Sequence, residues 1–263
     1  MKLNKTKIVA TVGPACSSRA MLKRLVAAGV DVFRINFSHS THDEAKKIVK
    51  DIRELNKELK VHISILGDLQ GPKIRIGQIP ESLNLSTGDS IILTTKNKNV
   101  TENNNSVPIN YSAFASDVDN NEKILINDGK LILKVVHTNK KDTVKAKVIQ
   151  GGLLEPNKGV NLPNTRISMP ALTKKDKEDV LFAIKNSFDW IALSFVRNKR
   201  DITTLQKIIG SNSEQKIPII AKIEKPQAIE NIDGIIKKAD GIMVARGDLG
   251  IEIPSEEVPL NQK

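Results

Sequence analysis

Charged and polar side chains stand beside four short apolar stretches of the sequence. They are Arg34, Asn36, Ser38, Asp68, Lys222, Glu224 and Asp248. Carboxylates near a lysine and an arginine are typical of a magnesium–phosphate site, because Mg²⁺ takes one or two protein carboxylates together with waters and substrate oxygens. The cations of such a site neutralise charge on a transferring phosphoryl group. The residue types therefore indicate phosphoryl chemistry.

Each of these features also has a structural interpretation. Lys222 and Glu224 could form a buried ion pair, GDLG could be a turn, and Arg34 could be the structural partner of Asp68. There is no GxxxxGKS/T loop, so a nucleotide would need another scaffold. The four histidines have no metal-ligand spacing; they are His39, His42, His62 and His137.

The stretch VFRINFSHS, residues 32–40, shows how such side chains could be presented. Alternate residues from Phe33 to Phe37 are apolar, and those from Arg34 to Ser38 are polar. Successive side chains of a strand face opposite sides, so one face would be apolar and the other would carry a guanidinium, an amide and a hydroxyl. The simpler interpretation is an amphipathic strand whose polar side faces water.

Predicted strands and helices alternate along the sequence, and this alternation would position the polar residues. The sequence predicts strands at residues 7–13, 32–38, 62–69, 190–196, 218–224 and 241–247. Between them it predicts helices from Ser18 to Gly29, after the capping-box spacing at Thr41, and over 173–186, 198–210 and 226–239. Alternation of this kind favours a parallel sheet. The polar residues lie at the strands' carboxyl ends, where (β/α) barrels build active sites.

A long segment without this alternation lies between the predicted strands at 62–69 and 190–196. Its turn signals, Asn127-Asp128-Gly129 and Asn139 to Asp142, are those of β-hairpins. We therefore expect an α/β fold of the (β/α) barrel type. Residues 1–70 and 168–263 would form the barrel domain, and residues 71–167 an inserted small all-β module.

The amino-acid composition argues against a membrane protein, a secreted protein and a nucleic-acid-binding protein. The 263 residues are 39% hydrophobic, without the run of 18 or more apolar residues of a membrane span or a signal-peptide h-region. Cys16 is the one cysteine, which suits a reducing compartment, so a soluble cytoplasmic protein is expected. The net charge of +11 comes from lysines interleaved with acidic residues, and aromatics are 3%. We expect no nucleic-acid partner and no membrane partner.

Six motifs together resemble pyruvate kinase over nearly the whole chain: KTKIVATVGPA, RINFSHS, GDLQGPKIRIG, NKGVNLP, AKIE and GIMVARGDLGIEIP. The resemblance implies transfer of the phosphoryl group of phosphoenolpyruvate to ADP, giving pyruvate and ATP. It implies that Arg34 contacts the phosphoryl group and that Lys222 stabilises its charge and that of the enolate. It also implies a (β/α)8 TIM-barrel domain, here truncated after the sixth strand, with residues 71–167 as an inserted β-barrel lid, and homo-oligomers, usually tetramers.

Ligand sets follow from the same resemblance. Glu224 and Asp248 would hold Mg²⁺ (or Mn²⁺), and the backbone amides of Gly247 and Asp248 would receive the substrate carboxylate. The nucleotide would lie near Asn36, Phe37, Ser38, His39, Arg75 and Lys158. The ligands of K⁺ would be Asn36, Ser38, Asp68 and the carbonyl of Leu69.

The sequence departs from this family at several positions. Lys73 stands where potassium-dependent members have a glutamate, and its ammonium could take the place of K⁺, so we expect little or no potassium activation. Lys225 follows AKIE where asparagine is common.

The family's last two barrel strands, a substrate-contacting threonine and a C-terminal domain have no counterpart in these residues. A six-strand sheet leaves its first and sixth strands as edges, which favours association. An inactive fragment or truncated product of a pyruvate kinase therefore stays open. So does another Mg²⁺-dependent barrel enzyme acting on a pyruvate enolate, such as an aldolase or a phosphoenolpyruvate mutase.

Overall fold

The computed structural model describes residues 5–96 and 106–263, which divide into two compact units. The first unit comprises residues 1–71, 171–223 and 230–243. The second comprises residues 72–170, 224–229 and 244–263. Each unit is described by itself, and the assignment of 71–167 to an inserted lid domain stays a prediction.

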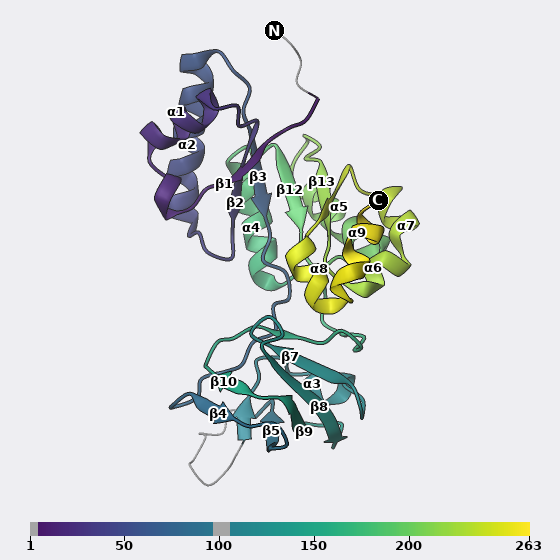
Figure 1. Cartoon of the computed structure of the whole chain (residues 1–263). Coiled ribbons are helices and arrows are strands. Elements are labelled where there is room, and N and C mark those ends of the chain that lie inside the picture. Colours follow the sequence, from purple (N-terminus) through teal and green to yellow (C-terminus); the bar gives the residue numbers. More distant parts are fainter. Residues whose placement is uncertain (1–4, 97–105) are drawn as a thin grey trace. The chain divides into compact units, whose positions relative to one another are not determined.

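A six-stranded sheet forms the first unit, in the order β1-β2-β3-β12-β13-β14. The strands are β1 (Val9–Thr11), β2 (Val32–Asn36), β3 (Ser64–Asp68), β12 (Trp190–Leu193), β13 (Ile219–Ile223) and β14 (Gly241–Val244). The pairs β1–β2, β2–β3, β3–β12 and β12–β13 are parallel. In Figure 1 the purple strands of the N-terminal segment lie beside the green β12 and β13. All six predicted strands are present, and β1 and β14 are the edges.

Strand β2 has the two faces that its sequence predicts. Phe33 and Ile35 are fully buried, whereas Arg34 and Asn36 are half-buried. Burying each such apolar side chain contributes about 1.5–3 kcal/mol, which fixes the register of the strand. The polar face of β2 is therefore fixed in place by the burial of the other face.

Four helices of the first unit begin at side-chain caps, and they are α1 (Arg19–Ala27), α2 (His42–Leu59), α4 (Lys174–Lys185) and α5 (Lys199–Asn212). The unit also contains α7 (Ile232–Ile236) and the 3₁₀ turn η1 at Pro14–Cys16. Ser18 caps α1, and the Thr41–Glu44 capping box predicted for α2 is formed. Thr173 and Asp176 make a second capping box at the start of α4. These caps satisfy backbone N–H groups that have no partner within the helix.

Two helical features differ from the predictions. The helix predicted over 226–239 is broken into α6 (Pro226–Glu230) and α7, because Asn231 leaves helical geometry and its side chain donates to the Arg197 carbonyl. An additional helix, α8 (Arg246–Glu252), begins within GIMVARGDLG, where a turn was one interpretation. The 3₁₀ turn η2 (Ser255–Glu257) and α9 (Val258–Gln262) follow it.

The second unit contains the predicted hairpins. Its six-stranded sheet has the order β11-β7-β8-β9-β5-β6, and a separate pair joins β10 to β4. The strands are β4 (Leu83–Leu85), β5 (Ser90–Thr94), β6 (Ser106–Pro108), β7 (Lys123–Ile126), β8 (Leu131–Thr138), β9 (Thr143–Gln150), β10 (Gly152–Leu154) and β11 (Val160–Asn161). One short helix, α3 (Phe114–Asp117), makes the segment not purely β, and its Phe114 is buried in the core of the unit.

Candidate active site

A buried cluster of charges joins three strands of the first unit. Asp68, at the end of β3, is 1% exposed, and Lys222, near the end of β13, is 7% exposed. The guanidinium of Arg34 donates to Asp68 Oδ2 from Nε at 2.7 Å, and the ammonium of Lys222 lies 3.2 Å from Asp68 Oδ1. Neighbouring cations stabilise a buried carboxylate, and the carboxylate compensates their charges in turn. The ion pair between Arg34 and Asp68, which the sequence left open, is therefore formed.

The strand register explains why these residues meet. Asn36 of β2 pairs with Asp68 of β3, and Arg34 pairs with Thr11 of β1. Arg34 also donates from Nη1 to the Thr11 hydroxyl at 2.8 Å, so its guanidinium is held on two sides. Side chains from the carboxyl ends of parallel strands meet at one edge of the sheet. The arrangement leaves two fixed cations at the end of the sheet where such folds bind substrates.

Ser194 belongs to this cluster, and the sequence reasoning missed it. It follows β12 and is 2% exposed. Its hydroxyl donates to the Leu69 carbonyl at 2.6 Å and accepts from Lys222 Nζ at 2.9 Å. A buried hydroxyl that both donates and accepts fixes the position of both partners. The available signal was a serine in the apolar run WIALSFV, directly after the strand.

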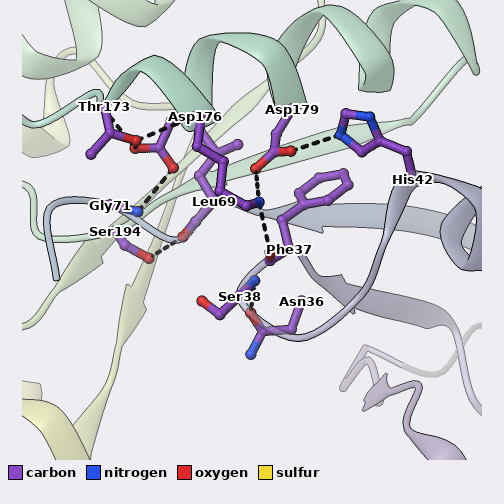
Figure 2. Close-up of polar contacts among 11 residues, drawn as sticks. Asn36, Phe37, Ser38, His42, Leu69, Gly71, Thr173, Asp176, Asp179 and Ser194 are labelled. Carbon is purple, nitrogen blue, oxygen red and sulfur yellow. Dashed lines mark hydrogen bonds and ion pairs between the residues drawn. The ribbon is translucent and has the colours of Figure 1, made fainter. Parts of the chain in front are cut away.

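The end of β2 and the turn after it carry the predicted nucleotide residues of the first unit, and the predicted potassium ligands Asp68 and Leu69 lie at the end of β3 and directly after it. The amide of Phe37 donates to the Asp68 carbonyl at 3.0 Å, and the amide of Ser38 donates to Asn36 Oδ1 at 2.9 Å. His39 is exposed beyond this turn. Figure 2 shows the contact between Ser38 and Asn36 and the one between Leu69 and Ser194. Amide and carbonyl oxygens have two lone pairs, so Asn36 Oδ1 and the Leu69 carbonyl can each accept one further contact. Their role as potassium ligands stays a prediction.

The two junctions of the predicted insert run next to each other in the second unit. Arg75 forms a bridge with Gly159 and donates from Nη1 to the Asn157 carbonyl at 2.8 Å. Lys158 is paired with Glu155 at 3.0 Å and is partly exposed. The methylene chain of Lys73 lies against Gly159. The segment that carries Lys73 and Arg75 therefore runs beside the segment that carries Lys158.

The predicted magnesium ligands also lie in the second unit. Glu224 directly follows β13 and is 1% exposed, whereas Asp248 is exposed in the first turn of α8, next to Gly247. Two carboxylates are a donor set that suits Mg²⁺ when substrate oxygens and waters complete its shell. In residues 5–96 and 106–263, no group of three or more His, Cys, Asp and Glu is arranged to hold a metal. The residue types at these two positions fit the preference of Mg²⁺ for carboxylate oxygens, and their role as its ligands stays a prediction.

Lys225, one of the sequence departures, has a structural partner. Its ammonium lies 2.5 Å from Glu252 Oε1 of α8, and that oxygen also accepts from Asn161 of β11 at 2.7 Å. Lys225 and Glu252 are both buried. The substitution therefore creates a buried ion pair within the second unit.

A family model described as pyruvate kinase, barrel domain, matches residues 3–263. The chain belongs to the pyruvate kinase family. Pyruvate kinase 2 of Synechocystis sp. is 44% identical over 98% of this chain and 44% of its own length. Pyruvate kinase of Thermococcus litoralis is 38% identical over 99% of this chain and 54% of its own length. The chain spans about half the length of the curated relatives it matches.

A solved structure gives the same result for the fold. A crystal structure of a pyruvate kinase from Cryptosporidium parvum superimposes with a TM-score of 0.93 and 35% identity, covering 98% of this chain and 54% of that one. This match and the family model confirm the resemblance seen in the motifs and the α/β barrel class. Within the described residues, no helix is long and apolar enough to cross a membrane.

Proposed function

We propose that this chain carries the phosphoryl-transfer site of a pyruvate kinase, which converts phosphoenolpyruvate and ADP to pyruvate and ATP. The observation that carries the proposal is the cluster of Arg34, Asp68, Ser194 and Lys222, held at the carboxyl ends of parallel strands. Family membership supports the assignment over an aldolase or a mutase.

In the reaction, an oxygen of the ADP β-phosphate attacks the phosphorus of phosphoenolpyruvate, and the bond from phosphorus to the enol oxygen breaks. The guanidinium of Arg34 binds the moving phosphoryl group. The ammonium of Lys222 stabilises the charge that builds on that group and on the enolate left behind. The enolate carbon then takes a proton to give pyruvate. Asp68 holds both cations in place throughout.

Other residues bind and orient the substrates in this proposal. The backbone amides of Gly247 and Asp248 hold the carboxylate of phosphoenolpyruvate. By the family resemblance, the residues that bind ADP are Asn36, Phe37, Ser38, His39, Arg75 and Lys158. Mg²⁺, held by Glu224 and Asp248, supplies charge neutralisation when it is bound. A lid role for residues 71–167, a cytoplasmic location and homo-oligomer assembly are proposed from the family alone.

Turnover of residues 1–263 with phosphoenolpyruvate, ADP and Mg²⁺ tests this function, with pyruvate as the measured product. A Lys222→Ala preparation is the control for contaminating host enzyme. We expect the substitution to lower kcat by about 100-fold or more, because it removes a cation that acts on developing charge. Equal pyruvate formation by the two preparations would contradict the proposal.

A further inference from the structure

Helix α4 contacts both loops that carry the proposed cation and nucleotide groups of the first unit. Lys175 Nζ donates to the Phe37 carbonyl at 2.8 Å, and Asp176 Oδ1 accepts from the Gly71 amide at 3.0 Å. These two contacts join the first turn of α4 to the segments after β2 and β3 (Figure 2). None of the α4 residues was singled out by the sequence motifs.

The Lys175 contact fixes one peptide plane on both of its sides. The carbonyl of Phe37 accepts from the ammonium, and the N–H of the same peptide, at Ser38, donates to Asn36 Oδ1 at 2.9 Å. A peptide is planar, so restraining its carbonyl also sets the direction of its N–H. The orientation of the Asn36 amide thus depends on where Lys175 places its ammonium.

Asp179 in turn positions Lys175. This carboxylate is 1% exposed, and its Oδ2 lies 2.7 Å from Lys175 Nζ. Its Oδ1 lies 2.7 Å from His42 Nε2, and the His42 ring stacks on Phe182 of α4 with centroids 4.2 Å apart. A flexible lysine is held in one rotamer when a buried carboxylate binds its ammonium. His42, Asp179 and Lys175 therefore form one continuous support for the β2 turn.

Asp176 does more than cap its helix. Its Oδ2 accepts from the amide and hydroxyl of Thr173, at 2.8 and 2.6 Å, which completes the capping box. That leaves Oδ1 for Gly71, two residues after Leu69, and the carboxylate is fully buried. A cap alone needs one carboxylate oxygen, so the second contact ties the segment after β3 to α4.

We propose that Lys175, Asp176 and Asp179 are positioning residues for the nucleotide-binding turn Asn36–His39 and for the Leu69 carbonyl. This inference rests on the proposed function for its substrate, ADP. The three residues touch no reacting atom in this scheme. They hold the backbone that presents the groups which do.

The test compares Lys175→Met with Lys177→Met in the 263-residue chain. Lys175 is 47% exposed, so methionine keeps its apolar stem without opening the core. Lys177 is an exposed lysine on the same helix and serves as the matched control. One readout is amide hydrogen exchange at residues 37–40, and the other is steady-state kinetics with each substrate varied.

We expect Lys175→Met to speed exchange at residues 37–40 and to raise KM for ADP by roughly tenfold, as loss of a charged hydrogen bond implies. KM for phosphoenolpyruvate should change less than twofold, because the substitution does not alter the proposed contacts of that substrate. Lys175→Arg, which restores a cationic donor, should recover most of the ADP affinity. Lys177→Met should match the wild type in all readouts.

Failure of the positioning role and failure of the proposed function give different results. Unchanged exchange at residues 37–40 in Lys175→Met, or equal effects on both KM values, would overturn the positioning role and leave the proposed function intact. Absence of turnover by the wild-type chain would overturn the proposed function, and with it the assignment of ADP as the positioned substrate.

Discussion

At the scale of single residues, Asp68 is the group on which the candidate site depends. It is a buried carboxylate with Arg34 on one side and Lys222 on the other. Its charge compensates two cations, while its backbone carbonyl accepts from the Phe37 amide. Asp68 therefore holds the charge cluster through its side chain and the turn after β2 through its backbone.

Replacing Asp68 with asparagine should lower the free energy of unfolding by about 3 kcal/mol or more, because it leaves the buried Lys222 and the half-buried Arg34 without their counter-charge. Urea unfolding measures this loss. Asp119→Asn is the control, since Asp119 is 71% exposed in its pair with Lys140 and should cost less than about 1 kcal/mol. Equal losses in the two variants would show that the Asp68 charge is not compensated as described.

Lys73 carries the prediction on potassium. Titrating turnover with KCl at constant ionic strength should give little or no activation, because a fixed ammonium supplies the monovalent charge. Lys73→Glu should gain activation by K⁺, since it restores the residue associated with potassium dependence. Strong activation of the wild type would refute the prediction.

At the scale of elements, the contact between α4 and the end of β3 requires a glycine. Gly71 has φ +69°, and a Cβ there would lie 2.7 Å from a ring carbon of Phe195 and 3.1 Å from the Ser194 Cβ. Both neighbours follow β12, and Ser194 is part of the charge cluster. A side chain at position 71 would therefore displace Phe195 or Ser194, and with Ser194 the charge cluster.

Gly71→Ala should destabilise the protein by about 2–4 kcal/mol, from left-handed strain plus overpacking. Gly29→Ala separates the two effects, since Gly29 has φ +101° with nothing near a Cβ, and should cost only about 1–2 kcal/mol. Thermal or urea unfolding gives both values. The prediction fails when Gly71→Ala costs no more than Gly29→Ala.

In the second unit, Tyr111 links α3 to the segment before α4. Its hydroxyl contacts the Asp117 carboxylate and lies 3.1 Å from the Ser168 hydroxyl. Burial, and then the hydrogen bond to Asp117, raise the pKa of Tyr111 above its usual 10.0. The folded state thus keeps this phenol protonated at a pH where the unfolded chain ionises it.

Tyr111→Phe should lower stability by about 1 kcal/mol at neutral pH. Because the folded pKa is raised, this advantage of the wild type is complete below pH 10 and is lost as the pH rises through the folded pKa. Urea unfolding at pH 8 and pH 10.5 measures the difference. Ile124→Val, a buried apolar change in the same core, should show the same loss at both pH values.

At the scale of the whole molecule, patterning predicted the elements and the sheet well. The alternation in VFRINFS settled which face of β2 is buried, and the hairpin signals at Asn127 and Asn139 located β7, β8 and β9. The hydrogen-bond partners of individual side chains could not be predicted from this patterning. Asn231 breaks a helix because its side chain meets a carbonyl 34 residues earlier, which periodicity cannot show.

The candidate site was predicted only in part, for a related reason. Arg34, Asp68 and Lys222 carry motif signals, whereas Ser194, Lys175 and Asp179 act through partners far away in the sequence. One signal was present: Asp176 and Asp179 lie on the buried face of α4 with Val180 and Ala183. Charged residues on an apolar helix face require partners. Here the partners are the Gly71 amide for Asp176, and Lys175 and His42 for Asp179.

The most direct test of the central claim follows phosphorus from donor to acceptor. We would record ³¹P NMR spectra of phosphoenolpyruvate, ADP and Mg²⁺ with residues 1–263, and with the Lys222→Ala chain alongside. The account predicts that the phosphoenolpyruvate signal falls as the γ-phosphate of ATP grows equally, and only with the wild-type chain. Release of inorganic phosphate in place of ATP, or identical spectra for the two chains, would contradict it.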